Sequence, residues 1–103
     1  SGRSVEEMLG DVPKFVSTPE IRVDCPDDIK FDVVRRAVAH FRGKYDVIDV
    51  DGVRVLFGDG WGLIRASNTQ PVLVTRYEAL TKGRLDQIQR EMEDWLRSQG
   101  ISP

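Results

Sequence analysis

The sequence predicts an α+β domain in which helices pack against a mainly antiparallel β-sheet. Three observations lead to this fold class. Two segments carry apolar residues at helical spacing, two Asp-Gly steps stand eight residues apart among β-branched and aromatic residues, and the predicted order is strand, helix, four strands, helix. At 103 residues the chain has the size of one domain with a core of its own.

The beginning of the chain predicts a connector. Ser4 is suited to cap a short helix, and Glu7 completes a capping box. Because Gly2 resembles the glycine that ends a helix, the sequence starts as though another domain preceded it, with a cloning remnant as the alternative. We therefore predict that residues 1–18 are the tail of a preceding domain with a hinge, and that residues 19–103 are the domain itself.

The first strand and the first helix follow this connector. Residues 20 to 24 predict a strand, which ends at Cys25 and Pro26. Residues 28 to 41 predict an amphipathic helix that ends at Gly43. The apolar side of this helix should face the sheet with Phe31, Val34, Val38 and Phe41.

Two hairpins come next, because Asp51-Gly52 and Asp59-Gly60 are strong signals for two-residue turns. They predict strands at about 46 to 50, 53 to 57 and 61 to 65. The first turn would set three cross-strand pairs: Val50 with Val53, Ile48 with Val55, and Asp49 with Arg54. The second turn would set two: Leu56 with Leu63, and Val55 with Ile64.

The last strand and the last helix complete the domain. Residues 72 to 78 predict a fourth antiparallel strand, and Thr81 is suited to cap a helix of about 82 to 99 that ends at Gly100. One apolar stripe should bury this helix, made of Leu85, Ile88, Met92, Trp95 and Leu96.

The composition limits the classes of function. The 15 basic and 17 acidic residues are spread along the chain and give a net charge of −2, so there is no broad footprint for nucleic acid or an anionic membrane. No apolar run approaches the about 18 residues of a membrane span. The single cysteine, Cys25, fits a reducing cytoplasm. We therefore expect a soluble cytoplasmic protein with no nucleic-acid or membrane partner.

The loop between the third and fourth strands of the meander holds the candidate site. Arg65, Ser67, Asn68 and Thr69 combine a guanidinium with small hydroxyl and amide side chains, the donor types that hold a phosphate. Small residues also let backbone N–H groups turn toward an anion, and Pro71 stiffens the exit. On composition alone, an ordinary solvated loop remains the alternative.

The segment GWGLIRASNTQPVLVTRYEA, residues 60 to 79, resembles the phosphate-binding loop and flanking strands in the C-terminal domain of the α-D-phosphohexomutases. The wording RASNTQP is similar to the phosphomannomutase/phosphoglucomutase branch. Asn68 and Gln70 depart from the Arg-x-Ser-Gly-Thr-Glu-Pro pattern that is more frequent in the phosphoglucosamine mutase branch. The entry STPE at residues 17 to 20 and the hairpin DGVR at residues 51 to 54 extend the resemblance to about residues 14 to 98.

The resemblance implies a TATA-binding-protein-like fold of the order β-α-β4-α. It also implies that Arg65, Ser67, Asn68 and Thr69 bind the substrate phosphate. The parent enzyme would interconvert hexose 1-phosphates and 6-phosphates through a bisphosphorylated sugar. Its phosphosugar partners would be mannose and glucose phosphates, and its other domains would be further partners.

Several groups of such an enzyme are missing from this sequence. The resemblance places the catalytic serine and the loop that holds Mg²⁺ in earlier domains, so we expect no catalytic residue, metal site or cofactor here. Asp49-Val50-Asp51-Gly52 is similar to a metal loop, but the hairpin accounts for it. The segment Val16 to Glu20 is expected to be the hinge of a lid-like movement.

Other residues that often carry chemistry predict structural roles. His40 should lie at the surface near a helix end, Cys25 should be a small packed residue, and Trp61 and Trp95 should fill the core. For Trp61 there is an alternative role, in which its ring forms one wall of the phosphate site. Arg76 predicts at most an ion pair with a carboxylate. An independent interaction module or a nucleic-acid-binding module is the alternative to the phosphosugar function.

Overall fold

The computed structural model describes residues 15–50 and 52–103. The predicted helix after Ser4, and Asp51 of the first turn, lie outside the described residues. The strands are β1 (Val16–Ser17), β2 (Ile21–Asp24), β3 (Asp46–Ile48), β4 (Val53–Leu56), β5 (Gly60–Ala66) and β6 (Val72–Ala79), and the helices are α1 (Lys30–Arg42) and α2 (Lys82–Ser98). The predicted α+β class and element order are confirmed.

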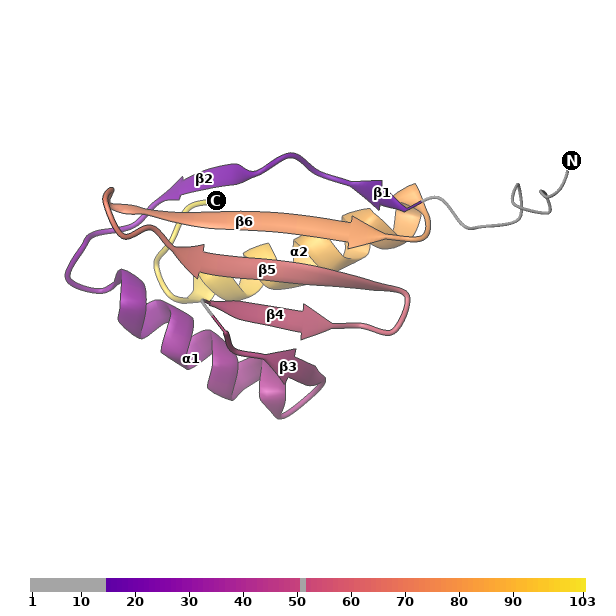
Figure 1. Ribbon diagram of the computed structural model, residues 1–103, viewed down its shortest axis with the longest axis horizontal. Helices are drawn as coiled ribbons and strands as arrows, with labels where there is room; N and C mark the ends of the chain where they lie inside the picture. The colour runs from indigo at the N-terminus through magenta and orange to yellow at the C-terminus, as the bar shows by residue number, and fades with distance from the viewer. Residues whose placement is uncertain (1–14, 51) are drawn as a thin grey trace, which may run out of the picture.

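All strand pairs of the sheet are antiparallel, in the order β1-β6-β5-β4-β3, and β2 also pairs with β6. Figure 1 shows β1 and β2 following one another along the same edge of β6. The sequence did not predict β1. Its pairing continues into Thr18, which donates its N–H to the Tyr77 carbonyl at 2.9 Å and accepts the Tyr77 N–H at 3.1 Å. Part of the predicted connector therefore belongs to the sheet.

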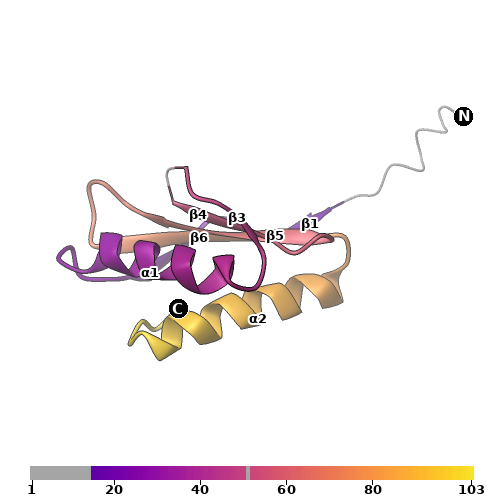
Figure 2. The ribbon, with the colours of Figure 1, turned by 90° about the horizontal axis from the view of Figure 1, so that it is seen from below.

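Both helices pack on one face of the sheet, as the edge-on view shows (Figure 2). Alternate strand residues point toward the helices and are fully buried, among them Val55, Ile64 and Tyr77. The other face carries charged side chains, such as Arg54 and Arg65, between apolar ones, such as Leu63 and Val74. This one-sided arrangement leaves an open sheet face beside the loop that follows β5.

The predicted apolar side of α1 is confirmed for Phe41, while Val34 and Val38 pack against the core only partly buried, and it was wrong for Phe31. Phe31 is 49% exposed, whereas Val33 and Ala37 are fully buried together with Phe41. Apolar residues lie on two neighbouring lines of this helix, and the contacts with the sheet select the line that contains Val33. The stripe of α2 is confirmed except for Trp95, which is half-buried, and Thr81 caps the helix by accepting the Arg84 N–H at 3.1 Å.

The first hairpin register was wrong by one residue. Ile48 lies opposite Arg54 and Val47 opposite Val55, so the connection is longer than two residues. A shift of one residue exchanges the two faces of a strand, and Ile48 is accordingly 47% exposed. Asp49 instead lies 3.2 Å from Arg42 of α1.

The second hairpin register was wrong by two residues. Val55 lies opposite Gly62, and the turn residues are Gly58 and Asp59, enclosed by a hydrogen bond from the Phe57 N–H to the Gly60 carbonyl at 2.9 Å. Gly58 takes the positive φ of this turn, 90°. Gly60 instead lies in β5, where a Cβ atom would be 2.4 Å from the Glu78 carbonyl oxygen. A shift of two keeps the faces unchanged, and Val55 and Ile64 still point to the same, buried face.

Candidate functional site

The candidate site forms where β5 leaves the sheet and returns as β6. Arg65 is the last exposed residue of β5 before the loop, and Ser67, Asn68 and Thr69 follow it. The hydroxyl oxygen of Ser67 accepts the N–H groups of Thr69 at 3.3 Å and Gln70 at 3.2 Å. The Ser67 N–H donates to the Val72 carbonyl at 3.1 Å. Ser67 therefore shapes the loop with its oxygen lone pairs, while its O–H remains able to donate to an anion.

The far end of the loop is held by the segment before α1. The buried Lys30 donates from Nζ to the Gln70 carbonyl at 2.9 Å and lies 2.7 Å from Oδ1 of Asp27. The Cys25 N–H donates to the Pro71 carbonyl at 2.9 Å. These bonds fix the loop on the body of the domain, which keeps its donors in place before a ligand arrives.

Sequence reasoning missed Lys30. Its signal was present, because Lys30 falls three residues before Val33 and seven before Ala37, on the buried side of α1. A lysine on a buried helix stripe needs a partner, and here the loop carbonyl and Asp27 supply it.

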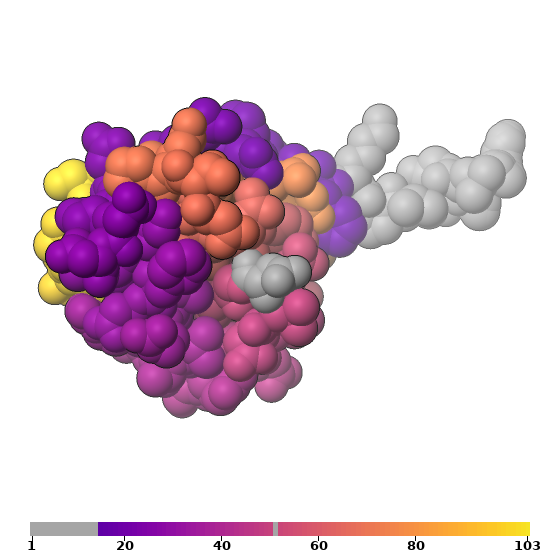
Figure 3. Space-filling view, turned by 60° about the vertical axis from the view of Figure 1, so that its left-hand side comes forward, coloured from indigo at the N-terminus to yellow at the C-terminus, as the bar shows by residue number. Residues whose placement is uncertain are grey.

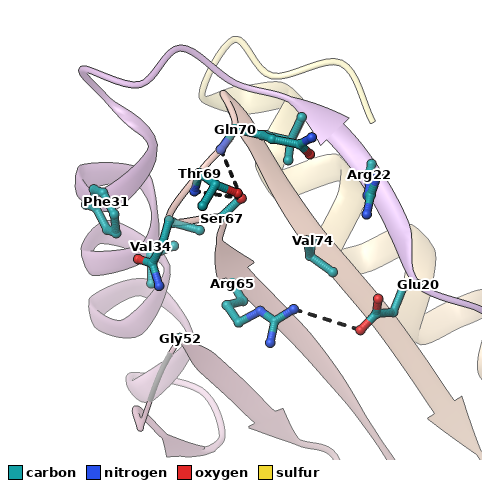
Figure 4. Close-up of a pocket in the computed structure, with 13 residues that line it drawn as sticks. Glu20, Arg22, Phe31, Val34, Gly52, Arg65, Ser67, Thr69, Gln70 and Val74 are labelled. Carbon is teal, nitrogen blue, oxygen red and sulfur yellow. Dashed lines mark hydrogen bonds and ion pairs between the residues drawn. The ribbon is translucent and has the colours of Figure 1, made fainter.

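The loop borders an open groove of about 790 Å³. All four predicted residues line it. The close-up labels three of them, Arg65, Ser67 and Thr69, on one side of β6 (Figure 4). The other lining residues come from β2 and the residue before it, from α1, from the turn before β4, from the end of β5, from the loop and from β6: Glu20, Arg22, Phe31, Val34, Gly52, Ala66, Gln70, Val72 and Val74. In the space-filling view the loop forms an orange ridge beside the violet surface of α1 (Figure 3).

A carboxylate lies beside the main cation of the groove. The Arg65 guanidinium is 3.8 Å from the Glu20 carboxylate, and both side chains are about half exposed, at 46% and 61%. An exposed pair at this distance is weak. Arg65 therefore has a partner that an incoming anion can displace.

Gly52 allows the first hairpin to approach the groove. Its φ is 135°, and a Cβ atom there would lie 2.7 Å from the Ile64 carbonyl oxygen and 3.2 Å from the Cα atom of Arg65. Only a glycine fits this conformation and this space. The turn therefore packs directly against the backbone that carries Arg65.

The two tryptophans and Arg76 lie outside the groove. Trp61 is at the start of β5, where it packs under the Arg54 guanidinium at 4.6 Å and donates to Glu78 at 3.3 Å. Its alternative as a wall of the site was therefore wrong, and neither Trp61 nor Trp95 is fully buried. Arg76 is exposed, and no carboxylate in residues 15–50 and 52–103 lies within ion-pair distance of it.

His40 and Cys25 have the structural surroundings that the sequence predicts. His40 is exposed and stacks on Trp95 with ring centroids 5.6 Å apart. Cys25 is 1% exposed, and burial raises the pKa of its thiol, with a smaller contribution from Asp28. A raised pKa disfavours the reactive thiolate.

Metal ligands do not come together in the described part of the chain. Among residues 15–50 and 52–103, no three His, Cys, Asp or Glu side chains are grouped so that they could hold a metal ion. In the same residues, no helix is long and apolar enough to cross a membrane. The chemistry that the groove offers is hydrogen bonding and charge for an anion.

Comparisons with known proteins show which family this chain resembles. The family model for the C-terminal domain of phosphoglucomutase/phosphomannomutase matches residues 20–94. A phosphoglucomutase of Neisseria meningitidis serogroup A is 40% identical over 95 residues, which are 89% of this chain and 21% of that protein. A phosphomannomutase/phosphoglucomutase of Pseudomonas aeruginosa is 38% identical over 97 residues, 93% of this chain and 21% of that protein.

A solved structure is similar as well. The crystal structure of a phosphoglucomutase/phosphomannomutase family protein from Burkholderia thailandensis superposes with a TM-score of 0.68 at 39% identity, covering 89% of this chain and 19% of that one. The chain thus spans about a fifth of the length of these relatives. By its sequence and its fold, the chain belongs to the phosphoglucomutase/phosphomannomutase C-terminal domain family.

Proposed function

We propose that this chain is the substrate-phosphate-binding domain of a phosphomannomutase/phosphoglucomutase that interconverts hexose 1-phosphates and 6-phosphates. The observation that carries the proposal is the grouping of Arg65, Ser67, Asn68 and Thr69 in one groove, on a loop that is fixed at both ends. A guanidinium, two hydroxyls and an amide on a fixed loop suit a phosphate, because several convergent donors can share its three terminal oxygens.

Each donor has a distinct task in this proposal. Arg65 supplies charge and two parallel hydrogen bonds, which lysine cannot reproduce. Ser67 donates its O–H while its oxygen holds the Thr69 and Gln70 N–H groups. Asn68 and Thr69 are exposed at the tip of the loop, where their side chains complete the set.

The domain would hold the phosphate that is not reacting. In a reaction through a bisphosphorylated sugar, one phosphate is transferred while the other must be gripped, and the two then exchange places. A loop that recognises phosphate and not sugar suits both orientations. Because phosphoryl transfer depends mainly on positioning and electrostatics, a remote grip raises turnover as well as binding.

The remaining chemistry would belong to other domains of a longer polypeptide. There, Mg²⁺ would assist transfer from a phosphoserine. The described residues of this chain do not group into a metal site, and none of the roles proposed for them involves the ion. Residues 19–103 would form the phosphate-binding domain. A lid-like movement of this domain in the longer polypeptide would have to preserve the bonds between Thr18 and Tyr77.

A titration of the chain tests the proposal directly. Backbone amide NMR with mannose 6-phosphate, glucose 1-phosphate and inorganic phosphate should show similar shifts at residues 65 to 69 for all three ligands. Arg65→Ala should abolish them. In the longer polypeptide, the same substitution should raise KM strongly for both hexose phosphates, and unchanged kinetics there would overturn the assignment.

A further inference from the structure

We infer that Arg22 is a second phosphate-binding arginine, which closes on the anion from the opposite side of the groove to Arg65. The inference rests on the proposed function and adds a residue from β2 to the four donors of the loop. Arg22 lies outside the loop motif, and no pattern in the sequence singles it out.

The register of the sheet brings the two arginines to one place. Val74 on β6 is paired with Arg22 of β2 on one side and with Arg65 of β5 on the other. Residues paired in one row point to the same face, so both guanidiniums rise from the open face. Both line the groove, and Figure 4 shows them on opposite sides of Val74.

The spacing suits one anion between two arginines. Neighbouring strands lie about 4.8 Å apart, so the backbones that carry Arg22 and Arg65 are separated by about 10 Å. Two arginine side chains that lean toward each other over the small Val74 can reach a phosphate group held between them. A dianionic phosphate monoester has charge and acceptor oxygens for two guanidiniums.

Arg22 is available for this role. It is exposed, and no carboxylate among residues 15–50 and 52–103 lies within ion-pair distance of it. Glu20 lies on the same side of β2, yet its carboxylate is directed to Arg65, at 3.8 Å. A phosphate that displaces Glu20 from Arg65 frees this carboxylate for Arg22 or for solvent, so the charges of the groove can rearrange around the ligand.

Phosphate titrations of matched variants test the inference. The 103-residue chain is titrated with inorganic phosphate, and the amide shifts of Ser67 to Thr69 report binding. Arg22→Gln should raise the apparent Kd by about threefold to tenfold, as expected for the loss of one partly exposed charged contact. Arg22→Lys should recover only part of the loss, because lysine keeps the charge and lacks the bidentate geometry.

The control is Arg90→Gln, which removes an exposed arginine from α2, away from the groove. It should leave the Kd unchanged, and thermal unfolding should confirm that all three variants remain folded. An equal loss in Arg90→Gln, or full recovery in Arg22→Lys, would indicate a general effect of net charge and would overturn the inference.

The experiment separates this inference from the proposed function. One outcome is that phosphate binds, that Arg65→Gln abolishes binding, and that the Arg22→Gln variant binds like the unmodified chain. In that case Arg22 has no role, and the phosphate-binding function of the loop is retained. If the unmodified chain shows no shifts at tens of millimolar phosphate, or Arg65→Gln changes nothing, both fail together.

Discussion

The Nζ atom of Lys30 lies 2.9 Å from the carbonyl oxygen of Gln70 and 2.7 Å from Oδ1 of Asp27. This buried contact joins the first turn of α1 to the loop that carries the phosphate donors, 40 residues further along the chain. The loop is short and its tip is exposed, so its position depends on a few bonds of this kind.

Loss of this contact should loosen the loop. Lys30→Met keeps the aliphatic stem but leaves the Gln70 carbonyl without its donor, and we expect a loss of about 1 to 3 kcal/mol in the free energy of unfolding. Amide exchange at Thr69 and Gln70 should accelerate more than exchange in β6. Lys82→Met, which removes an exposed lysine from α2, is the control and should change neither quantity. Equal protection of the loop in both variants would contradict a bracing role.

Arg65→Lys tests the geometry of the guanidinium against its charge. Lysine keeps the positive charge but offers no planar pair of donors, so phosphate affinity should fall about tenfold. The unfolding midpoint should stay the same, because the ion pair with Glu20 is long and exposed. Phosphate titration followed by NMR measures the first quantity, and thermal unfolding the second. An unchanged affinity would mean that charge alone accounts for binding.

Glu20→Gln should strengthen phosphate binding. The carboxylate competes with the ligand for Arg65, and its neutral amide removes both the competition and the repulsion of the anion. We expect affinity to increase by about twofold to fivefold, with a larger gain at low ionic strength. Asp24→Asn is the control, since Asp24 ends the strand that begins directly after Glu20 and does not line the groove. Weaker binding in Glu20→Gln would mean that Glu20 contacts the ligand.

Two glycines should respond to alanine in opposite ways. In Gly60→Ala the new Cβ atom would lie 2.4 Å from the Glu78 carbonyl oxygen, inside the β5–β6 pair, so unfolding should become easier by about 1 to 3 kcal/mol. Gly83 lies in the first turn of α2 with no atom within 4 Å of the new Cβ. Gly83→Ala should therefore stabilise the chain by about 0.5 to 1 kcal/mol. Urea unfolding of both variants tests the pair, and a similar cost in each would contradict the close approach at Gly60.

Tyr77 should make stability depend on alkaline pH. Its ring is fully buried, its hydroxyl has no partner among the described residues, and burial raises the pKa of the phenol far above its usual value near 10. Below pH 10 both the folded and the unfolded phenol are neutral. Above it, only the unfolded phenol ionises, so the free energy of unfolding should fall as pH rises.

Tyr77→Phe removes both the ionisation and the unpartnered hydroxyl. The variant should be about 1 kcal/mol more stable at neutral pH and should lose less stability above pH 10. Tyr45→Phe is the control: it also removes a phenol with a raised pKa, but one whose hydroxyl donates to Glu91 at 2.8 Å. It should not stabilise the chain. A loss of stability in Tyr77→Phe at neutral pH would show that the Tyr77 hydroxyl has a partner in solution.

The sequence was sufficient for elements whose ends depend on local chemistry. Thr81 and Gly100 bound α2 as predicted, because a cap and a left-handed glycine act on their immediate neighbours. The predicted hairpin registers were wrong because tertiary packing decides them. In the second hairpin the sequence predicts Gly60 as a turn residue, whereas its lack of a side chain allows the close contact with β6.

The residues of the candidate site also form two groups, those that a local motif predicts and those that only the fold brings together. The donors of residues 65 to 69 are contiguous, so a motif predicts them together. Lys30 reaches the loop through a hydrogen bond to Gln70, whose partner the helix pattern does not reveal. Arg22 reaches the groove through a row of three paired strands, so it is not visible before the strands are paired. To predict residues that meet only in the fold, the strand register must be known, and the register predicted from the sequence was wrong at both hairpins.

The two edges of the sheet have a consequence for the behaviour of the chain at high concentration. On one side, β1 and β2 are separated by Thr18, Pro19 and Glu20, and Pro19 has no N–H to offer. On the other, β3 has three residues, and the ion pair of Asp49 with Arg42 turns the chain away directly after it. Within residues 15–50 and 52–103, neither edge presents a long row of free backbone groups to a second molecule, which protects this part of the sheet from growing by strand addition into fibres.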